Sequence, residues 1–201
     1  MEITILLLIL AAVGYAFQAR DERRRVILLG TYLGNYQIEK LMATLTEGYM
    51  RALGETDRSR EDQIWSMLGT TETALGEQFG RFAADFSRVE GAQSRVSKLP
   101  LSIFYTARLF PAATFDLRKA LAIHADGIQS AATNSAQRSP KDKAFVLMAE
   151  MLLMQHTCHW FCKSKTVAAT RLVLRHQTPY AKVLESVAPA TRRAYAALTG
   201  Q

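Results

Sequence analysis

Cysteine is scarce in this sequence, with two residues among 201, and proline and glycine contribute only 5 and 11 residues. So few cysteines exclude a disulfide-held scaffold, and so little proline and glycine exclude a collagen-like repeat. Hydrophobic residues make up 49% of the chain and charged residues 21%, a balance that excludes a disordered chain. Length and composition therefore indicate one domain, or one domain with an appendage.

Sequence motifs that mark common enzymes are also missing. The chain has no Gly-x-Ser-x-Gly nucleophile motif, no Walker A loop, no His-Glu-x-x-His zinc motif and no dinucleotide-binding fingerprint. No segment alternates apolar and polar residues as the strands of a sheet do, and the hydrophobic periodicity is helical throughout. The sequence therefore predicts an all-α fold and shows no recognisable chemistry.

Basic residues outnumber acidic residues in only one part of the chain. There are 25 Lys and Arg against 18 Asp and Glu, which leaves a net charge of +7. Residues 1–137 hold 15 residues of each sign, whereas residues 138–201 hold 10 basic and 3 acidic residues. An anionic partner is therefore expected to contact the last third, with one local exception near the N-terminus.

One long hydrophobic run lies at the N-terminus. Ile3 to Phe17 (ITILLLILAAVGYAF) contains no charge, and Gln18 and Ala19 extend the uncharged stretch to 17 residues. That is the short end of what spans a hydrocarbon core at about 1.5 Å per residue. A cleaved secretory signal would need a basic start and a small-residue cleavage site, and a buried core helix would keep a polar face. We interpret residues 1–19 as a transmembrane anchor.

Four arginines after the run predict its orientation. Arg20, Arg23, Arg24 and Arg25 lie on its C-terminal side, and no Lys or Arg precedes it. The positive-inside rule then places the N-terminus outside and the rest of the chain in the cytoplasm. The same arginines are expected to contact anionic lipid headgroups. The Ala- and Arg-rich composition suggests a bacterial inner membrane.

The remainder is expected to form a cytoplasmic bundle of five to seven helices. Residues 20–54 are predicted to hold a basic juxtamembrane segment and an amphipathic helix, continuous with the anchor, and residues 55–201 the bundle with its basic C-terminal third. Helix start and stop signals place further helices after an N-cap at Ser59, between Pro100 and Pro111, from Phe115 to Ile128 with Gly127 as a stop near its end, and from Ser139-Pro140 to Phe161 or beyond.

The helix expected after Ser59 carries an apolar stripe made of two heptad rows. A stripe of this kind packs against a partner helix, so we expect self-association or docking through it. Gly69, Gly76 and Gly80 lie in the same helix, where each costs about 1 kcal/mol relative to alanine, and this predicts close backbone approach. The stripe comprises Trp65, Leu68, Leu75, Phe79, Phe82, Phe86 and Val89, with Glu72 interrupting one row.

The densest group of potential metal ligands is the segment HTCHWFC. His156, Cys158, His159 and Cys162 are residue types that bind zinc. A second pair of ligands is missing, and one straight helix cannot surround an ion with four ligands. Two buried, reduced cysteines and two histidines on the helix surface are the simpler interpretation. A metal- or redox-responsive sensor is the alternative.

Two further polar residues are predicted on apolar helix faces. His124 is expected to be a core histidine with a hydrogen-bond partner, because no nucleophile or carboxylate accompanies it. Glu150 lies in AFVLMAEMLLM, which is too short to span a membrane and is typical of a buried helix. A buried carboxylate needs a partner, so we expect an ion pair with Lys143 or with an arginine of another helix.

A basic face is predicted between Lys163 and Arg175, where Lys163, Lys165, Arg171 and Arg175 alternate with apolar residues. The scarcity of aromatics among these cations disfavours nucleic acid. An anionic lipid surface or an acidic protein is the expected partner, and a merely solvated helix surface is the alternative. These patterns favour a non-enzymatic, membrane-anchored interaction or scaffold component. The sensor and a small membrane-bound enzyme without a recognisable motif are the alternative functions.

Overall fold

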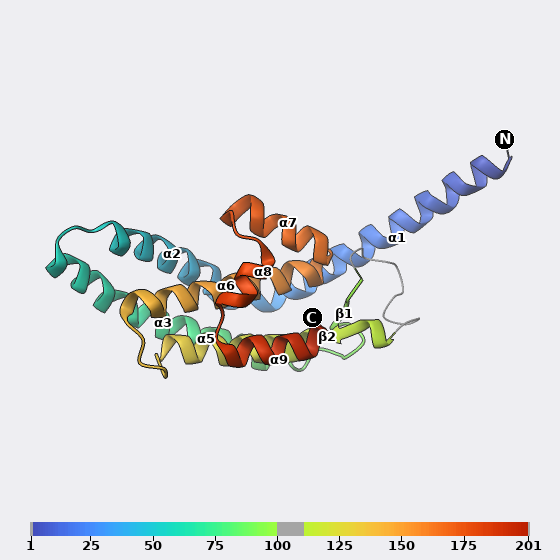
Figure 1. Ribbon diagram of the computed structural model, residues 1–201. Helices are drawn as coiled ribbons and strands as arrows, with labels where there is room; N and C mark the ends of the chain where they lie inside the picture. Colours follow the sequence, from blue (N-terminus) through green and yellow to red (C-terminus); the bar gives the residue numbers. More distant parts are fainter. Residues whose placement is uncertain (1, 100–110, 201) are drawn as a thin grey trace.

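The computed structural model describes residues 2–99 and 111–200. Within these ranges the chain is all-α, with eight α-helices and one pair of short strands (Figure 1). One long apolar helix precedes a bundle of seven, so the predicted fold class is confirmed. The helices are α1 (Glu2–Leu33), α2 (Ile38–Gly54), α3 (Arg58–Phe86), α5 (Leu117–Ala132), α6 (Pro140–Cys162), α7 (Lys165–His176), α8 (Tyr180–Ser186) and α9 (Pro189–Thr199), with strands β1 (Arg95–Ser97) and β2 (Thr114–Asp116) and a 3-10 helix η1 (Pro111–Ala113).

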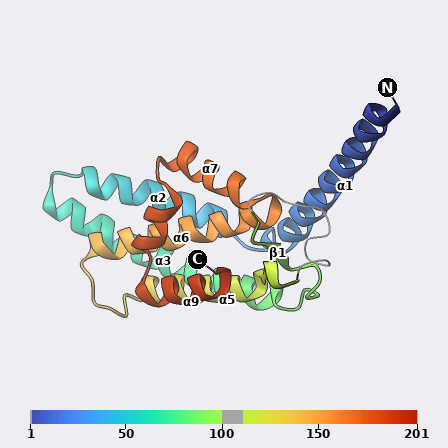
Figure 2. The same cartoon turned by 45° about the vertical axis from the view of Figure 1, so that its right-hand side comes forward.

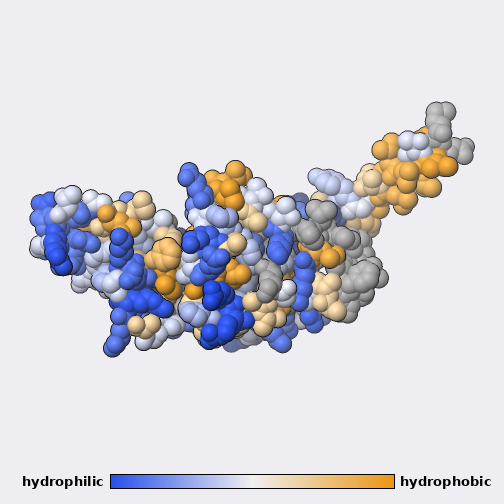
Figure 3. Space-filling model, viewed as in Figure 1, coloured by the Kyte–Doolittle hydropathy of each residue, from blue (hydrophilic) through white to orange (hydrophobic). Residues whose placement is uncertain are grey.

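Helix α1 has two halves with different surroundings. Its N-terminal half projects away from the bundle, and its C-terminal half lies along it (Figures 1 and 2). No part of its most apolar 18-residue window is buried, which is not the environment of a core helix. Figure 3 shows a concentration of apolar surface on this projecting half. Helix α1 is thus long and apolar enough to cross a membrane.

Helix α1 continues into the bundle and ends at Leu33. The amide of Gly34 still donates to the Gly30 carbonyl, 2.9 Å away, but the next two amides bond only three residues back. This tightening of the backbone ends α1. The expected continuity from the anchor is confirmed as far as Leu33, and α2 is a separate helix that packs on α3.

The N-cap of helix α3 lies two residues before the expected one, at Asp57 instead of Ser59. The carboxylate of Asp57, and not the hydroxyl of Ser59, accepts hydrogen bonds from the amides of Ser59 and Arg60. Asp is as good an N-cap as Ser and lies two residues upstream. The apolar stripe of α3 is inside the bundle: Leu75, Phe79, Phe82 and Phe86 are fully buried, and Trp65 is half-buried. The expectation of an exposed docking stripe is therefore wrong.

The two strands were not predicted. Strand β1 pairs with β2 in antiparallel register, with Val96 opposite Phe115. Three-residue strands are too short to show an alternating pattern. The helix that the sequence placed from Phe115 therefore begins two residues later, at Leu117, and Phe115 lies in β2. The short aromatic helix expected between Pro100 and Pro111 falls on residues 100–110, outside the described residues.

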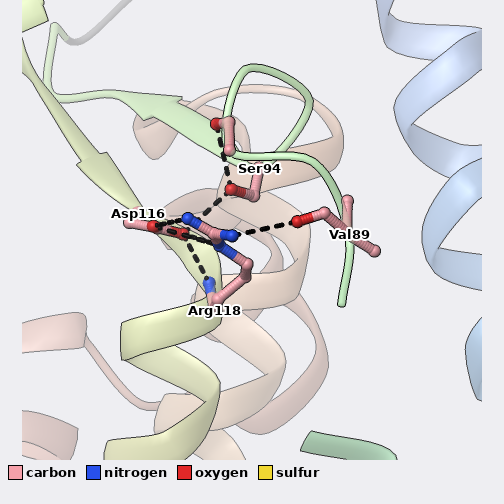
Figure 4. Close-up of polar contacts among 5 residues, drawn as sticks. Val89, Ser94, Asp116 and Arg118 are labelled. Atoms are coloured by element: carbon pink, nitrogen blue, oxygen red, sulfur yellow. Dashed lines mark hydrogen bonds and ion pairs between the residues drawn. The ribbon is translucent and has the colours of Figure 1, made fainter. Parts of the chain in front are cut away.

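An arginine clamp holds this strand pair against the end of α3 (Figure 4). The guanidinium of Arg118 forms an ion pair with Asp116, with Nη2 2.7 Å from Oδ2, and Nη1 donates to the Val89 carbonyl at 3.0 Å. Asp116 Oδ1 also accepts from the Ser94 hydroxyl at 2.9 Å and from the Arg118 amide, so this carboxylate caps α5 as well. The contacts with Arg118 and Ser94 outweigh burial and lower the Asp116 pKa.

Helix α6 is the centre of the bundle. It contacts α1, α2, α5, α7 and α8 and has more buried residues than any other described helix. Its start is as predicted, because Ser139 Oγ accepts from the Asp142 amide at 3.2 Å and Pro140 takes the first helical position. A helix that is apolar on all sides is typical of a buried central element.

Glycines permit close packing at two positions in the core. A Cβ on Gly127 would lie 2.5 Å from both Glu150 Oε2 and Thr191 Oγ1, and one on Gly76 would lie 2.4 Å from Gln129 Oε1. Gly127 is therefore a packing site between α5, α6 and α9, and the expected helix stop there is wrong, since α5 continues to Ala132. The predicted close approach holds for Gly76 alone, because no atom outside the local helix lies within 4 Å of a Cβ at Gly69 or Gly80.

Candidate functional site at the junction of the anchor and the bundle

Three groups of residues singled out in the sequence meet where α1 passes the C-terminal end of α6. The arginines after the hydrophobic run come from α1, the HTCHWFC segment ends α6, and the basic face begins in the link to α7. Figure 1 shows α1, the end of α6 and the start of α7 side by side at this point. We call this region the junction and define it by Arg25, Phe161, Lys163 and Glu22.

Aromatic packing fixes the second half of α1 on the bundle. Leu29 is buried, and the ring of Tyr32 meets that of Phe86 edge-on at 5.3 Å. Just beyond the helix, the Tyr36 hydroxyl donates to Asp85 Oδ2 at 2.5 Å. These contacts join α1 to α3 as part of the core, and the projecting half continues from this packed segment without a break in the helix.

Arg25 makes three contacts at the junction. Its Nη1 donates to the carbonyl oxygen of Phe161 at 3.2 Å, its guanidinium lies 5.6 Å from the centre of the Phe161 ring, and its Nε pairs with Asp21 at 3.0 Å. The Phe161 carbonyl lies in the last turn of α6 and has no partner within that helix. A cation at this end also interacts favourably with the helix dipole. Arg25 therefore caps α6 from another helix.

A second contact pairs Lys163 with Glu22. The ammonium of Lys163 donates to Glu22 Oε2 at 2.5 Å, and Gln18 Nε2 donates to Glu22 Oε1 at 3.2 Å. This pair links the residue that follows α6 with the middle of α1. Lys163 is thus occupied within the protein, whereas the sequence placed it on a face for an external partner.

The four arginines predicted at the membrane surface do not share one environment. Arg20, Arg23 and Arg24 are exposed, and Arg25 is half-buried in its contacts with Asp21 and Phe161. The exposed three stand where the projecting half of α1 leaves the bundle. They lie directly after the uncharged run of α1, whereas Arg25 joins α1 to the end of α6.

The predicted basic face is similarly divided. Lys165 lies over the rings of Trp160 and Tyr180, at 5.3 and 5.9 Å, as in a cation–π contact. Arg171 donates to His159 Nδ1 at 3.0 Å. Arg175 is exposed beside Val173 and Leu174, whose side chains are also exposed. The outer surface of α7 therefore combines the exposed Arg175 with apolar side chains.

The four candidate zinc ligands point in different directions. His156 is fully buried and stacks on Tyr180 at 4.3 Å, whereas Cys158 donates to Met154 Sδ at 3.8 Å and His159 contacts Arg171. Burial raises the pKa of the Cys158 thiol to about 12 and that of the Cys162 thiol to about 11. In the part of the chain that is described, no three His, Cys, Asp or Glu side chains gather as a metal site would require. Zinc binding remains a prediction of the sequence.

A buried polar cluster in the core was only partly predicted. His124 Nε2 lies 2.9 Å from Thr157 Oγ1, which lies 2.8 Å from the Tyr195 hydroxyl. His124 is thus the expected core histidine with a hydrogen-bond partner. His156, by contrast, has no hydrogen-bond partner at either ring nitrogen among the described residues. Burial lowers the pKa of both histidines to about 3, so both are neutral.

Glu150 does not pair with Lys143, so that expected ion pair is wrong, and no arginine among the described residues forms an ion pair with Glu150. Lys143 pairs with Glu72 of α3, whose Oε1 accepts from the Tyr49 hydroxyl at 2.6 Å. Glu150 is fully buried and its Oε1 accepts from the Ala188 amide at 2.9 Å. Burial raises the Glu150 pKa to about 7, although the Ala188 amide and the nearby Thr191 hydroxyl act in the opposite direction. Its apolar neighbours in sequence gave no indication of which helices face it.

Comparison with known proteins found no similar protein. No family model matches the chain, and no curated protein or solved structure is significantly similar to it.

Proposed function

We propose that this protein is a non-enzymatic, membrane-anchored interaction or scaffold component. The observation that carries the proposal is the environment of α1, whose apolar half stands clear of the bundle while its other half is part of the core. Apolar side chains such as Leu7 and Leu8 are exposed along the projecting half. Burial in a bilayer would remove this surface from water.

The direction of insertion follows from the charges at the end of the apolar half. Arg20, Arg23 and Arg24 are exposed there. On the positive-inside rule the bundle faces the cytoplasm and the N-terminus lies outside, in a single-pass arrangement. A rigid arm of this kind would hold the bundle at a fixed distance and orientation from the membrane, which suits a scaffold.

Membrane insertion is tested on the full chain with a C-terminal reporter. The wild-type protein should stay in the membrane after alkaline extraction, with the reporter active in the cytoplasm. Leu7→Arg with Leu8→Arg should release the protein, because arginine at the centre of a span costs about 3 kcal/mol per residue. The matched control, Leu7→Ala with Leu8→Ala, should remain inserted. A wild-type protein that is extracted, or a reporter active only outside, contradicts the proposal.

The partner-binding face we propose is the outer surface of α7. Val173, Leu174 and Arg175 are exposed there, and an acidic protein surface with an apolar centre would complement them. Crosslinking in intact membranes should capture a specific partner or a second copy of the chain. Leu174→Glu with Arg175→Glu should abolish the crosslink. Met50→Glu with Arg51→Glu changes an equally exposed pair on α2 and should leave it unchanged.

A further inference from the structure

A hollow of about 460 Å³ lies at the junction, between α1 and Lys163. Its α1 side is a single stripe at helical spacing, running from Tyr15 through Gln18 and Arg23 to Ile27. The hollow begins where the uncharged run ends, so in an inserted protein it would sit at the level of the lipid headgroups.

The walls of this hollow differ in polarity along α1. Tyr15 and Ile27 supply apolar surface, while Gln18, Glu22, Arg23 and Lys163 supply polar groups between them. The polar part contains two cations and one carboxylate and so is positive overall. Lys163 is already held in place by Glu22, and Arg23 is exposed, with no ion pair to any described residue.

We propose that this hollow binds the headgroup of an anionic phospholipid. The guanidinium of Arg23 can hold two oxygens of a phosphate at once, and the ammonium of Lys163 supplies a second positive charge. Tyr15 lies on the side of the projecting apolar half, along which the acyl chains would run. A soluble phosphate would use the cations and leave this apolar wall empty, so the mixed lining favours a lipid.

This inference rests on the proposed membrane anchoring and deepens it. A lipid bound between α1 and Lys163 would touch both the anchor and the residue that follows α6. Binding would therefore reinforce the junction in membranes rich in anionic lipid. The carboxylate of Glu22 competes with the lipid phosphate for the ammonium of Lys163 and therefore weakens phosphate binding.

The test uses the full chain in vesicles of zwitterionic phosphatidylcholine, with or without anionic phosphatidylglycerol. Lipids retained by the protein after gentle detergent extraction are identified by native mass spectrometry. Wild type should retain phosphatidylglycerol in preference to phosphatidylcholine. Arg23→Gln with Lys163→Gln should lower that preference on the order of tenfold. Lys182→Gln with Arg192→Gln removes the same charge from exposed positions outside the hollow and away from α1, and should preserve the preference.

A second variant gives an effect of opposite sign. Glu22→Gln removes the competing carboxylate and should increase phosphatidylglycerol retention, so the test does not depend on the stability of the double variant. Two results would overturn the site. One is equal retention of phosphatidylglycerol by wild type and by the Arg23/Lys163 double variant. The other is a loss of retention in the control variant as large as that in the double variant. Displacement of the lipid by inorganic phosphate at low concentration would show a small-anion site instead. Flotation of the protein with pure phosphatidylcholine vesicles reports anchoring separately, so failure of anchoring is distinguished from failure of the site.

Discussion

The guanidinium of Arg25 in α1 donates to the carbonyl oxygen of Phe161 at the end of α6, at 3.2 Å, across 136 positions of sequence. The same side chain lies over the Phe161 ring. One arginine thus satisfies a helix end and joins α1 to the central helix of the bundle. The Glu22–Lys163 pair and the packing of Tyr32 on Phe86 also hold α1 against the bundle.

Removal of the Arg25 side chain should loosen the junction. We expect Arg25→Ala to lower the free energy of unfolding by about 1–3 kcal/mol, because it leaves the Phe161 carbonyl without a partner and removes a cation–π contact. Urea unfolding of the full chain in detergent measures this change. Arg24→Ala, an exposed neighbour, should change stability by less than about 0.5 kcal/mol. Equal effects of the two substitutions would contradict the assigned role of Arg25.

Glu150 should make the protein less stable as pH rises. Its folded-state pKa of about 7 lies above the ordinary value of 4.5, so its contribution is fully present below pH 4.5 and is lost as pH rises through 7. Glu150→Gln keeps an oxygen for the Ala188 amide and carries no charge. Above pH 7 the variant should be more stable than wild type by up to roughly 3 kcal/mol. Urea unfolding across this pH range should show the two stabilities converge near pH 4.5.

The buried histidines should act in the opposite direction. With folded-state pKa values near 3 and an ordinary value of 6.5, His124 and His156 stay neutral while the unfolded chain takes up protons. Stability is therefore lost as pH falls from 6.5 towards 3. His156→Phe retains an aromatic ring against Tyr180 and removes two unpartnered nitrogens. Its stability advantage over wild type should grow as pH falls, by up to about 1.4 kcal/mol per unit.

The control for this histidine is His176→Gln. His176 is exposed at the end of α7, where desolvation and the neighbouring Arg175 lower its pKa, but it lacks the full burial of His156. We expect His176→Gln to change the acid limb far less than His156→Phe does. A His156→Phe variant with an unchanged acid limb would show that His156 is protonated in the folded protein.

Gly127 should not tolerate a side chain. Gly127→Ala would place a Cβ 2.5 Å from atoms of Glu150 and Thr191, and we expect a loss of about 1–3 kcal/mol from overpacking. Gly69→Ala meets no atom outside its local helix within 4 Å and should stabilise the protein by up to about 1 kcal/mol. Thermal unfolding of both variants measures the difference. Stabilisation by Gly127→Ala would mean that α5, α6 and α9 are not packed as described.

Local signals in the sequence were sufficient for several elements of the fold. Ser139-Pro140 predicted the start of α6 because capping depends on neighbouring residues alone. The strand pair escaped prediction because three residues per strand carry no period. The paired strands lie more than fifteen residues apart, and neither their pairing nor the contacts of Arg118 with Asp116 and Val89 are revealed by a local pattern.

The sequence by itself determined that this is a helical protein with one uncharged N-terminal run and four arginines behind it, because periodicity and charge are local properties. Only the tertiary structure decided which charged side chains of the protein form ion pairs or hydrogen bonds with other helices. Arg25 and Lys163 are occupied at the junction, and Lys143 pairs with Glu72, whereas Glu150 forms no ion pair with any described residue. Ion pairs between helices depend on which faces meet, and that is settled by packing of the whole core.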